Sequence, residues 1–89
     1  MFHAQQSAGE ILDWGIDYRP KLDGATGLTS TWSISPTEGM TMYGATMTDA
    51  QVTITVGSDR AGELFIVTNT LPTSNGDVLV EHIEFYIAP

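Results

Sequence analysis

The feature that most constrains the fold is a pair of apolar segments near the end of the sequence, ELFIVTNTL and DVLVEHIEFYIA, joined by PTSNG at 72–76. An Asn-Gly step between β-branched and aromatic residues is a strong hairpin signal, because both residue types tolerate the positive φ that tight turns require. In the first segment Phe65 and Val67 alternate with Leu64 and Ile66, so this strand is apolar on both faces. One face is expected in the core of a β-sandwich. The other is either a second buried layer or an exposed patch for a partner.

Further strands are expected upstream of this hairpin, because apolar and polar residues alternate with the period of a half-buried strand. The segments are 11–18, 28–35, 40–47 and 51–57. Gly44 marks a β-bulge in the third of them, and Trp32 alternates with Leu28 and Ile34, which places its indole in the core. About six or seven short strands, separated by frequent turn signals, predict an all-β fold, an immunoglobulin-like antiparallel β-sandwich.

The first ten residues have no periodicity and are mostly small and polar. We expect residues 1–10 to form a flexible N-terminal arm that is ordered against a neighbouring protein, and residues 11–89 to form the sandwich domain. Ordering such an arm costs backbone entropy, so its contact has to bury apolar groups. Phe2 and Ile11 are the expected partner-binding residues of the arm, and Leu64 and Ile66 those of the hairpin.

The charge balance excludes several classes of partner. Eleven acidic side chains stand against three basic ones, which gives a net charge of −8. Three cations, Arg19, Lys21 and Arg60, are too few to neutralise several phosphates, so neither nucleic acid nor an anionic membrane surface is an expected partner. The absence of cysteine excludes a disulfide scaffold and cysteine-ligated zinc. No long apolar run and no signal-like start are present, which predicts synthesis in the cytoplasm.

No residue pattern typical of catalysis is present. His3 and His82 have no cluster of further ligands around them, so no metal is expected. Asp13 and Asp17 would lie about 13 Å apart along one strand, too far to share a proton. The sequence contains neither a nucleophile elbow nor a phosphate-binding loop, and the loop aspartates fit no calcium motif. We expect a protein that is not an enzyme and needs no cofactor.

Five short motifs occur in a characteristic order: LDW at 12–14, IDY at 16–18, TSTWSI at 29–34, VTNT at 67–70 and TSNG at 73–76. Together they resemble the small tailed-bacteriophage virion proteins described as fibre–tail adaptor proteins. The resemblance covers residues 11–87, nearly the whole chain.

The resemblance implies a non-enzymatic structural protein of the virion, made in the host cytoplasm and present in multiple copies. It would act as a tail or head–tail adaptor that attaches fibres or neighbouring rings by protein–protein contact. Tail, fibre, portal or adaptor proteins are the expected partners. One alternative is a capsid decoration protein bound to the major capsid protein. Another is a carbohydrate- or cell-surface-binding β-sandwich module that uses Tyr43, Tyr86 or Trp14.

Overall fold

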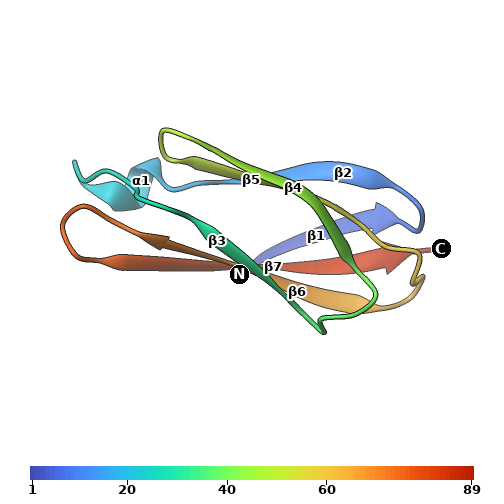
Figure 1. Cartoon of the computed structure of the whole chain (residues 1–89). Coiled ribbons are helices and arrows are strands. Elements are labelled where there is room, and N and C mark those ends of the chain that lie inside the picture. The colour runs from blue at the N-terminus through green and yellow to red at the C-terminus, as the bar shows by residue number, and fades with distance from the viewer.

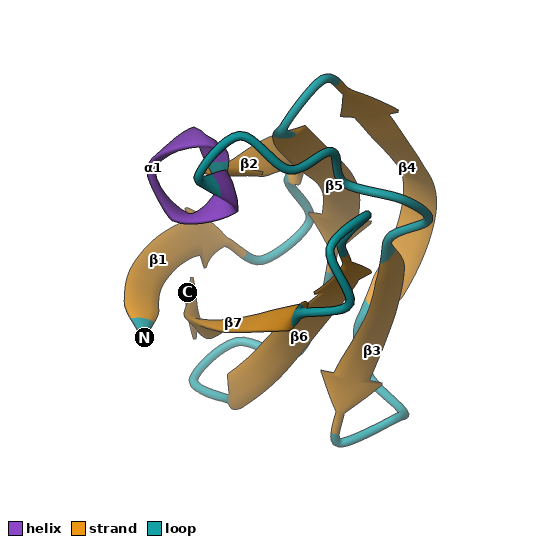
Figure 2. Ribbon diagram, turned by 90° about the vertical axis from the view of Figure 1, so that its left-hand side faces the viewer, coloured by secondary structure: helices purple, strands orange, loops and turns teal.

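Seven strands and one short helix make up the chain in a computed structural model that describes residues 1–89 (Figure 1). The strands lie in two facing sheets, and the molecule measures 42 × 19 × 18 Å (Figure 2). The elements are β1 (Phe2–Ser7), β2 (Ile11–Asp17), α1 (Arg19–Leu22), β3 (Thr31–Ser35), β4 (Thr41–Thr48), β5 (Gln51–Gly57), β6 (Leu64–Pro72) and β7 (Val78–Ala88). The prediction of an all-β sandwich is confirmed.

The four-stranded sheet has the order β1-β7-β6-β3, and the three-stranded sheet has the order β2-β5-β4. Neighbouring strands are antiparallel, except that β1 runs parallel to β7. In constant-type immunoglobulin domains the second, fifth and fourth strands share one sheet, and the third, sixth and seventh share the other. The order of β2-β5-β4 and β3-β6-β7 agrees with that scheme. The immunoglobulin-like assignment itself stays a prediction.

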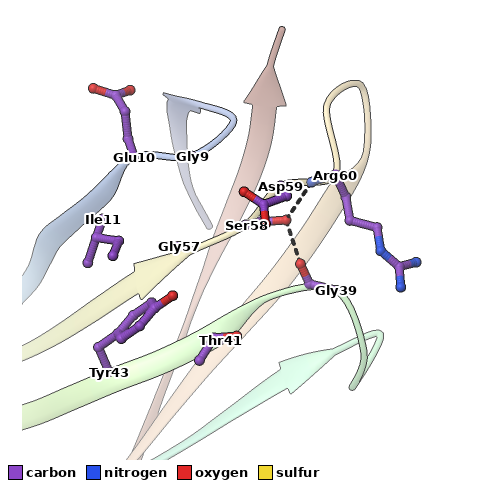
Figure 3. Close-up of a pocket in the computed structure, with 10 residues that line it drawn as sticks. All are labelled: Gly9, Glu10, Ile11, Gly39, Thr41, Tyr43, Gly57, Ser58, Asp59 and Arg60. Carbon is purple, nitrogen blue, oxygen red and sulfur yellow. Dashed lines mark hydrogen bonds between the residues drawn. The ribbon is translucent and has the colours of Figure 1, made fainter.

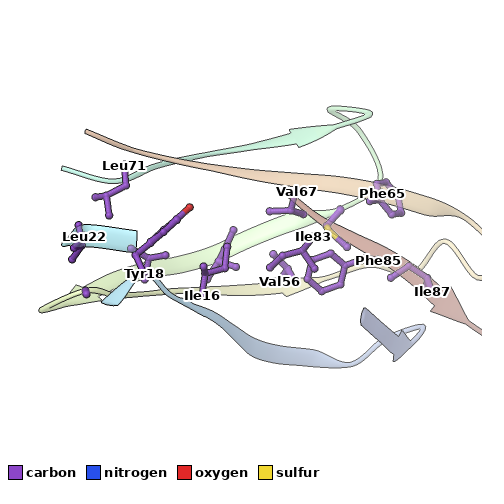
Figure 4. Close-up of a cluster of buried hydrophobic side chains, with 14 residues drawn as sticks. Ile16, Tyr18, Leu22, Val56, Phe65, Val67, Leu71, Ile83, Phe85 and Ile87 are labelled. Carbon is purple, nitrogen blue, oxygen red and sulfur yellow. The ribbon is translucent and has the colours of Figure 1, made fainter. Parts of the chain in front are cut away.

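The hydrophobic core lies between the sheets and is built from alternate residues of the central strands (Figure 4). Since successive side chains of a strand point to opposite faces, every second residue of β5, β6 and β7 is available for this core. The completely buried apolar side chains are Val52, Ile54, Val56, Phe65, Val67, Leu71, Phe85 and Ile87. The intervening residues of β6 and β7 face outwards, and they include the apolar residues Leu64 and Ile66.

Residues 73–77 connect β6 and β7 in the predicted hairpin. The Gly76 amide donates to the Thr73 carbonyl at 3.1 Å, and the Thr73 amide donates to the Asp77 carbonyl at 2.8 Å. Gly76 has a φ of 91°, whereas Asn75 has no positive φ. The turn therefore places one residue in the left-handed region rather than two, the arrangement typical of hairpin loops longer than two residues.

The first ten residues do not form the flexible arm expected from the sequence. Six of them make β1, which pairs along β7 from Phe2 opposite Ile83 to Ser7 opposite Ala88. The side chain of Gln6 is buried and donates from Nε2 to the Val56 carbonyl at 3.2 Å. Main-chain pairing and a buried amide thus hold this largely polar segment on the sandwich, and Ala4 packs against the core.

Strand β3 begins later than the alternation of residues 28–35 predicts. It starts at Thr31, while the Leu28 amide donates to the Pro72 carbonyl beside the hairpin. Leu28 is exposed, so its expected place beside Trp32 in the core is wrong. Trp32 itself is half-buried and packs against the core, as predicted.

Two local features interrupt the regular strands. The single turn α1 follows β2 and was not predicted. Its Pro20 lies in the first turn, where a proline costs no hydrogen bond. In β4 the register with β5 shifts between Met42 and Gly44, which leaves Tyr43 as the extra residue of a β-bulge. This bulge was expected at Gly44.

Candidate functional site

The outer face of the four-stranded sheet carries an apolar surface that we call the outer patch: Leu64 and Ile66 of β6 with Tyr86 of β7. Leu64 lies directly opposite Tyr86 in the antiparallel ladder. Leu64 is 54% exposed, Tyr86 is also exposed, and Ile66 is half-buried. Exposed Val78 and Val80 lie on the same face nearer the hairpin, separated from Tyr86 by His82 and Glu84.

A shallow depression borders the outer patch where β1 lies against β7. It measures about 340 Å³, and Tyr86 forms part of its wall together with Ala4 and Gln5. His3 and Glu84 also line the depression, and His3 Nδ1 lies 3.2 Å from Glu84 Oε1. The outer patch is therefore continuous with a recess whose far side belongs to the first strand.

Away from Ile11 and Tyr43 at one end, the outer face of the three-stranded sheet is polar. Asp13 on β2 accepts a hydrogen bond from the hydroxyl of Thr55 on β5. Asp17 is held by Arg19, whose Nη2 lies 2.6 Å from Oδ2. Hydrogen bonds from the Arg19 side chain and backbone keep the pKa of Asp17 below its ordinary value. Each carboxylate thus has its own partner, and the two form no acid–base pair.

A second surface, which we call the glycine hollow, lies at one end of the three-stranded sheet (Figure 3). It measures about 260 Å³, and Gly9, Gly39 and Gly57 line it. Ile11 and Tyr43 provide its apolar side. A Cβ atom on Gly57 would lie 3.1 Å from each of these two side chains, so glycine is needed to leave space between them.

Two local features shape the glycine hollow. The bulge in β4 inserts Tyr43, and bulges commonly redirect a side chain. The Ser58 hydroxyl donates to the Gly39 carbonyl and accepts from the Arg60 amide at 3.1 Å, while the Ser58 carbonyl accepts from the Gly9 amide at 2.9 Å. Buried Ser58 therefore ties together the three loops around the hollow.

Every cationic side chain of the protein is already paired with one of its own carboxylates. Arg19 contacts Asp17, and Lys21 contacts Glu81 at 3.4 Å. Arg60 lies 3.9 Å from the carboxylate of Glu63, three residues farther along the chain. Eleven acidic residues less these three leave eight without a lysine or arginine partner.

The four residues expected to bind a partner do not form one site. Leu64 and Ile66 lie together on the outer patch. Ile11 belongs to the glycine hollow at the end of the other sheet. Phe2 begins β1 and is exposed at the edge of the four-stranded sheet. The sequence did not indicate the hollow, since its glycines come from three distant segments.

The aromatic residues considered for sugar binding are also separated. Tyr86 faces outwards on the four-stranded sheet, and Tyr43 lies on the three-stranded sheet. Trp14 is half-buried and packs edge-on against Phe85, with ring centroids 5.4 Å apart. These residues therefore provide no common platform for a sugar ring.

The histidines make ordinary polar contacts on the sheet. Nδ1 of His82 lies 2.8 Å from the hydroxyl of Thr68, its neighbour across the ladder. No group of three or more histidine, aspartate or glutamate side chains is arranged around a common point for a metal ion. The chain has no helix with the length and apolar character needed to cross a membrane.

Comparison with known proteins identifies the family. No curated protein matches the chain. The family model described as podophage GP4 fiber-tail adaptor protein gp77 matches residues 6–86 of the 89. The match extends from the buried end of β1 to the outward Tyr86 of β7 and so includes both sheets. The chain therefore belongs to the podophage GP4 fibre–tail adaptor family, whose members are structural proteins of the phage virion.

Proposed function

We propose that the protein attaches a fibre or a neighbouring ring to the phage tail, and that the outer patch makes one of its contacts. The observation that carries this proposal is the two-sided apolar character of β6. Its inward residues, among them Phe65 and Val67, fill the core, while Leu64 and Ile66 face away from the core beside Tyr86. The outward residues contribute nothing to the core, so burial against a partner is the role their chemistry suits.

The shape and composition of the outer patch suit a protein partner. Tyrosine is among the residues enriched at the energetic centre of interfaces, where it combines a large apolar surface with a polar tip. The threonines and His82 farther along the same face supply a polar surround. A partner covering a standard interface of about 800 Å² per protein would bury the patch and reach the recess beside β1.

Phe2 and Ile11 complete the proposed contacts. β1 pairs on one side only, with β7, so its other edge is open to a neighbouring protein. Phe2 is 52% exposed at the start of this strand and would be covered by the same neighbour. Ile11 lies on the other sheet and would meet a different partner. Contacts on two sides are what a connecting protein requires, and the same arrangement repeated in multiple copies would link a ring to fibres.

The proposal is tested by placing a charge in the outer patch. We expect Leu64→Asp to leave thermal unfolding within a few degrees of the wild type and to reduce the number of copies per purified particle by about tenfold, because a buried unpaired carboxylate is costly at an interface. Copies are counted by quantitative mass spectrometry. Thr46→Asp, at an exposed residue of β4, adds the same charge elsewhere and should incorporate normally. Normal incorporation of Leu64→Asp would contradict the proposal.

A further inference from the structure

We propose that the glycine hollow receives a single lysine or arginine side chain from a partner protein, with the aliphatic stem between Ile11 and Tyr43 and the charged head beside Asp59. This inference rests on the proposed function, because it gives the adaptor its second contact. The hollow lies on the three-stranded sheet, and the outer patch lies on the four-stranded sheet.

The size of the hollow favours a side chain over a free ligand. Its volume of about 260 Å³ falls below the range of roughly 300–1,000 Å³ that is typical of small-molecule sites. A lysine or arginine side chain is long and narrow, and both residues pack their methylene stems on apolar surface while the charge stays in a polar setting. A side chain of this type therefore matches a cavity with one apolar side and one polar end.

The walls of the glycine hollow match both the aliphatic stem and the charged head of a lysine or arginine side chain. Ile11 is 53% exposed and Tyr43 is 57% exposed, although both border the same narrow space over Gly57. Covering them with methylene groups would remove apolar surface from water. The face of Tyr43 can also attract a cation directly.

The polar end of the hollow carries a carboxylate without a cationic partner. Asp59 and Arg60 both line the hollow, but the Asp59 side chain lies beside Ser58, whereas the Arg60 side chain extends away from Ile11 and Tyr43 (Figure 3). Arg60 pairs with Glu63, and the remaining cations, Arg19 and Lys21, pair with other carboxylates. Asp59 appears in no ion pair, so its charge is available to a partner.

Charge complementarity identifies the occupant. With a net charge of −8, and with each lysine and arginine already beside a carboxylate of its own chain, the protein chiefly offers carboxylates, which attract a cationic partner. A second copy of this chain carries the same net charge of −8 and would be repelled. The occupant is therefore a basic side chain of a different virion protein.

The chemical class of the occupant is tested with small probes on the intact protein. Nα-acetyl-arginine amide and Nα-acetyl-lysine amide are titrated, and amide signals are followed by NMR. We expect saturable shifts at Gly39, Gly57 and Ser58, and a loss of affinity of about tenfold in Asp59→Asn. Asp23→Asn removes a carboxylate near α1 and should bind like the wild type. Equal shifts with Nα-acetyl-norleucine amide or N-acetylglucosamine, or no shifts at these residues, would overturn the inference.

Incorporation into particles separates this inference from the proposed function. Asp59→Lys should reduce the copies per particle by about tenfold through repulsion of the basic side chain, while Asp23→Lys should not. If Asp59→Lys incorporates normally and Leu64→Asp does not, the hollow is not a contact and the adaptor function stands. If both incorporate normally, the proposed function fails as well.

Discussion

The indole Nε1 of Trp14 donates a hydrogen bond of 2.8 Å to Oε1 of Gln6 and so links β2 in one sheet to β1 in the other. The amide group of Gln6 also donates to the carbonyls of Val56 and Glu10. One buried side chain thus satisfies three groups on three segments. The buried position of the Gln6 side chain explains how the polar strand β1 can be part of the sandwich.

Removing the side-chain amide of Gln6 should lower the free energy of unfolding. We expect Gln6→Ala to lower the free energy of unfolding by roughly 1–3 kcal/mol, because the Trp14 donor and a buried carbonyl would lose their partner. Urea unfolding followed by tryptophan fluorescence measures the change. Gln5→Ala, at the exposed neighbour on the same strand, should stay near the wild type. Equal stability of the two variants would show that the link contributes little.

The hairpin turn depends on the left-handed conformation of Gly76. We expect Gly76→Val to destabilise the protein by roughly 1–3 kcal/mol, because a β-branched residue resists a φ of 91°. Gly44→Val is the matched control: Gly44 has no positive φ, and a Cβ there would meet no atom within 4 Å. Thermal unfolding of both variants compares them directly, and a larger loss for Gly44→Val would contradict the explanation.

Trp32 contributes to the core without being completely enclosed. We expect Trp32→Ala to lower the free energy of unfolding by about 3 kcal/mol, the lower end of the range for large aromatic residues in cores, because this indole is half-buried. Ser33→Ala, at the next, outward-facing residue, should change it little. Chemical denaturation of the two variants gives the comparison. Unchanged stability of Trp32→Ala would mean that the ring is not packed.

Tyr18 makes stability sensitive to alkaline pH. Burial, and secondarily the charge of Glu81, raise the pKa of Tyr18 from 10.0 to about 12. Below pH 10 the phenol is protonated in both the folded and the unfolded protein, and its contribution is fully present. As pH rises from 10 toward 12 the unfolded protein ionises first, so the free energy of unfolding should fall by up to about 2–3 kcal/mol.

Urea unfolding between pH 9 and pH 12 tests this dependence. Tyr18→Phe removes the ionisable group and should flatten the decline in this window. A decline of the same steepness in Tyr18→Phe would assign the effect to other groups.

Local sequence patterns correctly predicted the strands whose inward and outward faces are set by alternating apolar and polar side chains. The alternation in β5 and the Asn75-Gly76 step between β6 and β7 depend on neighbouring residues, so the sequence displays them directly. The two-faced pattern of β6 likewise indicated Leu64 and Ile66 as outward-facing apolar residues. Here prediction and structure agree because a period of two suffices to assign the faces.

The features that were missed depend on residues far apart in the sequence. β1 is held by a hydrogen bond between Gln6 and Val56, fifty residues apart. Leu28 lies outside the core because its backbone amide donates a hydrogen bond to the Pro72 carbonyl beside the hairpin. The glycine hollow needs loops from three parts of the chain to meet at Ser58. Local sequence patterns do not encode contacts between residues so far apart in the chain, so these contacts are seen only in the folded structure.

The parallel pairing of β1 with β7 has a mechanical consequence. The chain enters the ladder at Phe2, opposite Ile83, and leaves it at Ala88, opposite Ser7. A force that pulls the two ends of the chain apart along the strands would load this ladder in shear, so that its hydrogen bonds would have to yield together rather than one after another. A sandwich closed in this way is suited to withstand tension applied along its length.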